Sequence, residues 1–225
     1  MHEKLTVMTE SHSSPYHTIP KERIANVIDA IYAFSMTLLV TTISIPPKYM
    51  QTTSPQPVHA IFASVLPDLL HYFIAFIILA LFWYFEHQRF RHLTHLNRTL
   101  LFFTIASLSF VCLIPFTTNI AGDFPFDMFG AMLFELNIFI LGVLILAQWF
   151  YIRSRARELV PSLDDSHIRR EIQWAFVFPA LAVAGFALAV IGLPGTSAFF
   201  LLAPFILAFL YWKDPEKNRQ TKTGQ

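Results

Sequence analysis

The sequence predicts an all-α, polytopic membrane protein with six transmembrane helices and both termini in the cytoplasm. Composition, the length of the apolar segments and the placement of the basic residues support this prediction. Of the 225 residues, 55% are hydrophobic and only 14% are charged, whereas a soluble domain has about a quarter of its residues charged. A soluble globule could not hide 24 Phe residues, so we expect lipid around the protein. The net charge of +1 points to no nucleic-acid partner.

Six apolar segments approach or exceed the length of about 20 residues that crosses a bilayer. None of them alternates polar and apolar residues as a membrane β-strand does. The Pro-rich stretch 47–58 predicts a short external loop, and Leu-Pro-Gly-Thr at 193–196 predicts a tight turn between the last two spans. The predicted spans are 24–46, 63–85, 99–121, 128–151, 172–193 and 197–212, of which the last is short.

The basic residues give the spans a direction. All Lys and Arg residues except Lys48 lie before the first span, between spans two and three, between spans four and five, or after the sixth. Because cytoplasmic loops are enriched in Lys and Arg, both termini are predicted to be cytoplasmic and the location to be the cell (plasma) membrane. The chain divides into a polar segment 1–22 without the apolar core of a signal peptide, a six-helix transmembrane domain 23–212 and a polar tail 213–225.

The first span and the residue just before it include ionisable groups that a plain anchor does not need. Ionisable groups at membrane depth are rare and costly, so they favour a functional role. Arg23 and Asp29 are six residues apart, too far for a pair on one helix face. We therefore expect their partners to lie on other helices.

Hydroxyl and bulky apolar residues are mixed further along the first span. Phe34, Leu38 and Thr41 follow an i, i+4, i+7 spacing and form one helix face, with Thr37 beside it. A face of this kind is typical of a conduction path with a hydrophobic constriction. Alternatively, Ser and Thr hydroxyls bond back to their own helix or to a neighbouring helix.

Spans two to four contain isolated polar or special residues. His87, His92 and His95 follow the second span, but no HExxH pattern and no nearby Cys favours a metal site. Pro115 predicts a bend in the third span. Cys112 is expected to be inert packing. Glu135, about two turns into the fourth span, is expected to be either a hydrogen-bonded residue between helices or a titratable group.

No catalytic motif appears in the chain. The sequence has no GxSxG, Walker or GxGxxG pattern, so neither an enzyme nor a bound cofactor is expected.

The chain resembles the prokaryotic members of the transmembrane-protein-175 family, which are relatives of the lysosomal potassium channel. The first helix of the family carries Arg, three residues, then Phe-Ser-Asp, and later an embedded Thr. Arg23, Asp29 and Thr37 hold these positions, while Val27 and Ile28 replace the Phe and Ser. Two further segments match the family: FWYFEHQRF at 82–90 and IPFTTNIAGDF at 114–124.

The resemblance implies a potassium-permeable leak channel, in which four chains surround a pore formed by their first helices. The implied partners are other copies of the chain in a homotetramer, the lipid bilayer, and K⁺ and other monovalent cations, with no cofactor. Phe34, Leu38 and Thr41 would line the pore and its constriction, and Thr37 would support selectivity. A polar network would hold the first helix in register: Arg23, Asp29, Trp83 and His87.

Two alternatives remain from the sequence. A proton-coupled secondary transporter would use Glu135 and Asp29, although no paired broken helices support it. A non-conducting membrane scaffold subunit would use Phe34 as a permanent plug.

Overall fold

The computed structural model describes residues 20–45, 57–124, 127–193 and 195–212. Most of the polar segment 1–22, Lys48, most of the loop 47–58 and the tail 213–225 lie outside these residues. The described residues form helices and no strands, in agreement with the predicted all-α class. The helices are α1 (Lys21–Leu38), which continues as the 3₁₀ helix η1 (Leu39–Thr42), α3 (Val58–His92), α4 (Arg98–Asp123), α5 (Met128–Ser154), α6 (Ala156–Leu159), α7 (Asp165–Ala175), α8 (Val177–Val190), η2 (Thr196–Leu201) and α9 (Leu202–Trp212).

Five of the predicted spans correspond to helices that are long and apolar enough to cross a membrane. The sixth, Thr196–Trp212, is a shorter apolar helix, as its sequence indicated. The fifth begins earlier than predicted, because α7 and α8 together run over Asp165–Val190. The structure therefore supports a multi-pass membrane protein.

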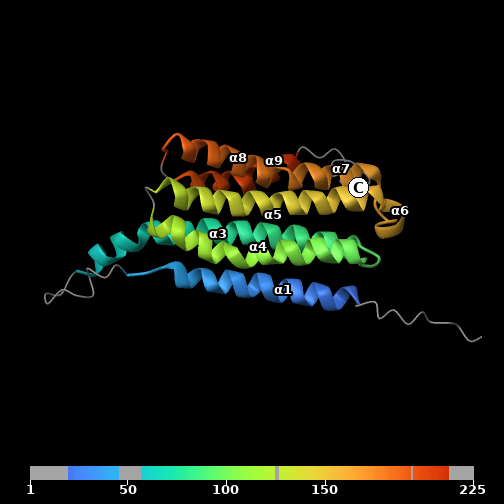
Figure 1. The fold of residues 1–225 in the computed structure, drawn as a ribbon, viewed down its shortest axis with the longest axis horizontal. Coiled ribbons are helices and arrows are strands. Elements are labelled where there is room, and N and C mark those ends of the chain that lie inside the picture. Colours follow the sequence, from blue (N-terminus) through green and yellow to red (C-terminus); the bar gives the residue numbers. More distant parts are fainter. Residues whose placement is uncertain (1–19, 46–56, 125–126, 194, 213–225) are drawn as a thin grey trace, which may run out of the picture.

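The second span is longer than the sequence predicted. Predicted as 63–85, it is the 35-residue helix α3, with Pro67 inside it. A helix of this length measures about 52 Å, more than the roughly 30 Å of a bilayer core. Figure 1 shows that its first part projects from the bundle at an angle. A proline inside a helix is a common cause of such a bend.

The long helices lie side by side in one bundle (Figure 1). α1 and η1 pack on α3 and α4 at one side, α5 packs between α4 and α8, and η2 contacts α3, α8 and α9. Successive long helices run in opposite directions, so the start of α1 and the end of α9 lie at the same end of the bundle. Every Lys and Arg within the described residues belongs to a helix end or connection at that end.

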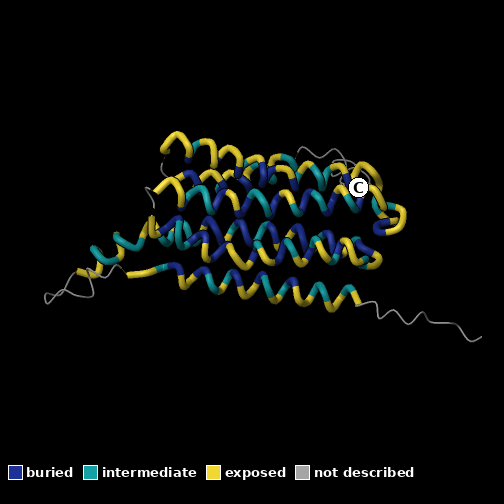
Figure 2. The backbone as a smooth tube through the Cα atoms, in the orientation of Figure 1, coloured by how far each residue is buried: buried dark blue, intermediate teal, exposed yellow. Residues whose placement is uncertain are grey.

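The core of the bundle is apolar and its outer surface is also apolar. Figure 2 shows buried segments along the inner sides of α3, α4 and α5 and exposed segments around them. Ile78, Ile114 and Leu141 are fully buried, whereas Phe102 is 70% exposed. Exposed large apolar side chains suit lipid rather than water. Cys112 is also exposed, so the expectation that it packs inside is wrong: it lies on the outward face of α4.

Candidate pore helix and its polar anchor

α1 packs into the bundle by one face only. Ile28, Tyr32 and Ser35 on α1, followed by Leu39 and Thr42 on η1, are buried. These residues recur every three or four positions, which is the spacing of one helix face. They contact α3 and α4. The opposite face of α1 has no covering helix within the described part of the chain.

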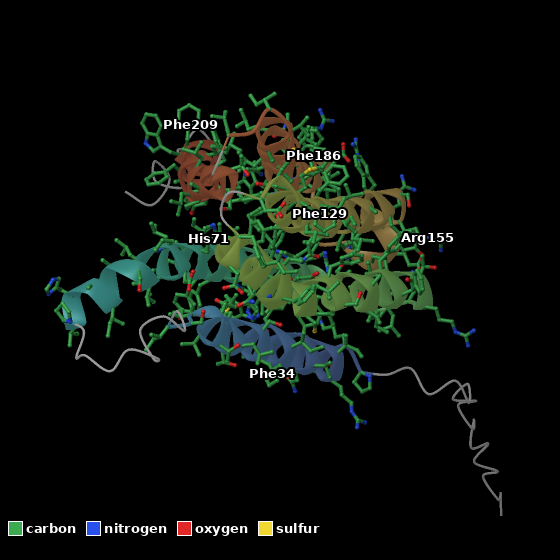
Figure 3. The ribbon with its side chains drawn as sticks, turned by 60° about the vertical axis from the view of Figure 1, so that its left-hand side comes forward. Phe34, His71, Phe129, Arg155, Phe186 and Phe209 are labelled. Carbon is green, nitrogen blue, oxygen red and sulfur yellow. The ribbon has the colours of Figure 1, made fainter. Side chains whose placement is uncertain are left out.

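The uncovered face of α1 contains most of the predicted pore residues. Phe34 is 62% exposed and projects from the side of α1 that is turned away from the other helices (Figure 3). Thr37 and Thr41 are also exposed, whereas Leu38 is half-buried. At about 100° per residue, Thr37 lies opposite the centre of the buried face, and Leu38 lies at the edge. Thr37 therefore lies in the middle of the uncovered face of α1, beside the row formed by Phe34, Leu38 and Thr41.

The hydroxyl groups of this helix are bonded to its own backbone. Thr37 Oγ1 donates to the Phe34 carbonyl at 2.7 Å, and Thr41 Oγ1 donates to the Leu38 carbonyl at 2.6 Å. Buried Thr42 bonds in the same way to Leu39 at 2.7 Å. The alternative prediction, that Ser and Thr hydroxyls bond back to their own helix, is therefore confirmed for Thr37, Thr41 and Thr42. A role of Thr37 in selectivity stays a prediction.

Three of the four residues predicted to form a polar network lie together. Trp83 Nε1 of α3 donates to Asp29 Oδ1 of α1 at 2.8 Å, so the expectation that Asp29 has its partner on another helix is confirmed. The rings of Trp83 and His87 lie 5.6 Å apart. Arg23 is exposed, and no hydrogen bond or ion pair joins it to these residues in the described part of the chain. In the single chain it lies outside the network, because its position turns it to the uncovered face of α1.

A second contact fixes the start of α1 near this network. Lys21 Nζ donates to the Leu93 carbonyl, just beyond α3, at 2.6 Å. A cavity of about 280 Å³ lies between the two helices. It is lined by Lys21, Glu22, Ala25, Asn26, Asp29, His87, Phe90 and Arg91. Asp29 and His87 therefore share a polar space at the basic end of the bundle.

An ion pair that the sequence did not reveal lies beneath α1. Glu86 and Arg89 of α3 are each only 1% exposed and are joined to one another. Arg89 also interacts electrostatically with Tyr32 of α1 and with Glu171 of α7. Three helices thus meet around one buried guanidinium group. A Glu and an Arg three residues apart were the available signal, but the predicted end of the span at residue 85 placed them in a solvated loop.

The three His residues do not gather into a metal site. His95 Nε2 lies 3.4 Å from Glu158 Oε1, while His87 stacks near Trp83. The described residues contain no group of three His, Cys, Asp or Glu side chains that could hold a metal ion.

Apolar spans with basic residues at one end define a multi-pass membrane protein, and one partly uncovered helix gives it a candidate site. The family model described as the endosomal/lysosomal potassium channel TMEM175 matches residues 23–115. These residues include α1 from its third residue on, the Asp29–Trp83 contact and the Glu86–Arg89 pair. The predicted resemblance to the transmembrane-protein-175 family is therefore confirmed.

Relatives of known description are ion channels rather than enzymes. A protein of Streptomyces collinus described as a potassium channel is 24% identical over 194 residues, which cover 84% of this chain and 90% of that protein. The rat endosomal/lysosomal proton channel TMEM175 is 33% identical over 101 residues, or 43% of this chain. That match covers only 20% of the rat protein.

Solved structures show the same fold. The crystal structure of a lysosomal potassium-selective channel TMEM175 homologue from Chamaesiphon minutus superimposes with a TM-score of 0.70 at 19% identity, covering 84% of this chain and 97% of that one. A variant of the potassium channel MtTMEM175 matches with a TM-score of 0.53 at 13% identity, covering 89% of this chain and 93% of that one.

Proposed function

We propose that the chain is one subunit of a homotetrameric, potassium-permeable channel of the cell membrane, with α1 of each subunit around a central pore. The description of the Streptomyces relative as a potassium channel, over nearly the whole of both chains, supports this proposal. The basic end of the bundle would face the cytoplasm.

The observation that carries the proposal is the uncovered face of α1. Asn26, Thr37, Thr41 and Ser44 are exposed on it, in a helix that is otherwise apolar enough to cross a membrane. Polar side chains in spanning helices normally face a bundle interior or a water-filled cavity rather than lipid. Since one helix cannot enclose a pore, a pore along this face would need further copies of α1 from other subunits.

Phe34 would then form the narrowest apolar ring of the pore. Four phenyl groups around one axis make a constriction that passes ions only when it is wetted. Leu38, which is half-buried in one chain, would contribute at the contact between subunits. Asp29, bonded to Trp83, would hold α1 against α3 and so set the rotation of the face.

A liposome flux assay on the purified protein tests the proposal. We expect K⁺ efflux from proteoliposomes, and a several-fold faster efflux for Phe34→Ala because the smaller side chain widens and wets the constriction. Phe102→Ala is the matched control, because Phe102 is also largely exposed but lies on α4. The K⁺ efflux of this variant should equal that of the unmodified protein.

Several results would decide against the channel. Absence of K⁺ flux together with no effect of Phe34→Ala would favour the scaffold alternative. Saturable uptake that needs a pH gradient and disappears in Glu135→Gln would favour the transporter. Because the rat relative is described as a proton channel, proton flux should be recorded in the same vesicles.

A further inference from the structure

Glu135 is a carboxyl group in the interior of the bundle that has no role in the proposed pore. It lies on α5 and is 0% exposed, and no regular hydrogen bond joins either of its carboxyl oxygens to another of the residues that the structure describes. Buried polar groups in proteins nearly always have a partner, so each exception calls for a physical explanation.

α8 and η2 enclose this carboxyl group. A Cβ atom on Gly185 of α8 would lie 2.5 to 2.7 Å from the carboxyl atoms, so a larger residue at this position would require the carboxyl group to move. Thr196 of η2 is the polar side chain that interacts with the carboxyl group. Its hydroxyl is also buried and lacks a regular hydrogen bond. Two polar groups therefore face one another in an apolar enclosure.

The outer side of Glu135 is apolar as well. A cavity of about 200 Å³ lies between α5 and α8, where Phe186 is seen in Figure 3. Besides Glu135, its lining consists of Leu136, Phe139, Ala182, Val183 and Phe186. Among the described residues, this lining brings no cationic or hydrogen-bonding side chain to the carboxyl group.

No charge on the surrounding helices compensates an ionised Glu135. α8 and η2 contain no ionisable side chain at all, and no ion pair reaches Glu135 from any described residue. The ionisable groups on the other elements nearby are His59, Asp68, His71, Tyr72, Tyr84, Glu86, His87, Arg89, Arg91 and His92 of α3, Arg98, Cys112 and Asp123 of α4, Asp127, Tyr151 and Arg153 before or on α5, Arg157 and Glu158 of α6, Asp165, His167, Arg169, Arg170 and Glu171 of α7, and Tyr211 of α9. Those of α6 and α7 lie at the opposite end of the bundle.

We propose that Glu135 and Thr196 form a proton-binding site, and that the bound proton locks α8 and η2 onto α5. An ionised carboxylate in this enclosure would be strongly unfavourable, because it would lose water and gain no partner. The neutral acid avoids that cost and can donate its O–H to Thr196 Oγ1. Release of the proton would leave a negative charge on Glu135 next to Gly185 and weaken the packing of α8 and η2 on α5. The inference does not depend on ion conduction.

Infrared spectroscopy of the protein in lipid tests the site directly. At neutral pH we expect a carbonyl stretching band from a protonated carboxylic acid, which disappears in Glu135→Gln. The control is Glu158→Gln, because Glu158 is an exposed carboxylate; it should leave the band unchanged. A spectrum without such a band, or a band that persists in Glu135→Gln, would overturn the proposal.

Thr196→Val provides an independent measurement if Glu135→Gln fails to fold. It removes the acceptor for the acid O–H but keeps the shape of the side chain. We expect the band to remain and to move to higher frequency, as for a carboxylic acid that loses its hydrogen bond. An unmoved band would show that the proton is not shared with Thr196 and would contradict the proposed site.

The lock itself is tested by thermal unfolding at several pH values. The folded protein keeps the proton, whereas an exposed Glu135 in the unfolded chain ionises as pH rises above the ordinary carboxyl range. The unmodified protein should therefore lose stability relative to Glu135→Gln between mildly acidic and mildly alkaline pH. Parallel pH profiles for the two proteins would refute the lock.

Discussion

At the scale of single residues, the main result is how charges are placed in an apolar bundle. Asp29 is partly exposed and has a hydrogen bond from Trp83 on another helix. Glu86 and Arg89 are buried and paired on one helix. A pair of buried charges is strongly destabilised when one partner is removed, whereas replacing both by apolar residues is often neutral. We therefore expect a single substitution in the Glu86–Arg89 pair to lower the stability of the protein more than replacement of both residues.

Removal of Glu86 alone should damage the fold. Glu86→Gln leaves the Arg89 charge buried without its paired carboxylate, although Glu171 and Tyr32 also interact with it, and we expect a loss of about 3 kcal/mol in unfolding free energy. The double variant Glu86→Met and Arg89→Met should recover most of this loss. Thermal unfolding in detergent measures both.

The exposed pair Arg155–Glu158, with 3.3 Å between its charged atoms, is the control for this experiment. Glu158→Gln should change stability by less than about 0.5 kcal/mol, since exposed ion pairs contribute little. A double variant that is less stable than Glu86→Gln would contradict the interpretation of the pair as a compensated buried charge.

The bond between Trp83 and Asp29 should matter less than the buried pair. Trp83→Phe removes the indole donor but keeps an aromatic ring, and we expect a loss of about 1 kcal/mol, because both groups are partly exposed. Trp212→Phe changes a Trp that is 77% exposed at the end of α9 and should be neutral. Equal unfolding temperatures for the two variants would show that the bond does not hold α1 in place.

At the scale of helices, the sequence predicted which segments form apolar helices better than where those helices end. The predicted span 63–85 ended where polar residues begin, but α3 continues to His92 because Glu86 and Arg89 neutralise one another inside the bundle. Spacing placed Phe34 on the uncovered face of α1. It could not show that Leu38 turns towards the buried face, since that depends on which side of α1 meets α3 and α4.

Close contact between α5 and α8 depends on small residues that the sequence analysis did not single out. A Cβ atom on Gly142 would lie 2.7 Å from Cδ and 3.1 Å from the backbone nitrogen of Pro179. Because the proline ring is rigid, Gly142→Ala should force the helices apart and cost about 1–3 kcal/mol.

Gly122→Ala is the matched control for this contact. Its nearest atom would be Asp68 Oδ1 at 3.6 Å, an ordinary contact, and alanine favours a helix over glycine. This variant should be as stable as the unmodified protein or slightly more so. If Gly142→Ala unfolded at the same temperature as Gly122→Ala, the distance between α5 and α8 would not be set by the glycine.

At the scale of the whole molecule, helix direction and charge agree. Both ends of the described chain lie at one end of the bundle (Figure 1), together with every described Lys and Arg. The acidic residues Asp68, Asp123 and Asp127 lie at the other end. Since basic loops are retained in the cytoplasm, this asymmetry predicts a single orientation for all four subunits of the proposed tetramer.

Cysteine labelling in intact cells tests this orientation, because Cys112 is the single cysteine of the chain. In a Cys112→Ser background, Ser162→Cys places an exposed thiol between α6 and α7 at the basic end, and Met128→Cys places one at the opposite end. A membrane-impermeant maleimide should label Met128→Cys in intact cells, and Ser162→Cys only after the membrane is opened. The reverse pattern would place the basic end outside the cell. It would also turn the candidate pore around, with Asp29 and its contact to Trp83 near the external entrance instead of the cytoplasmic one.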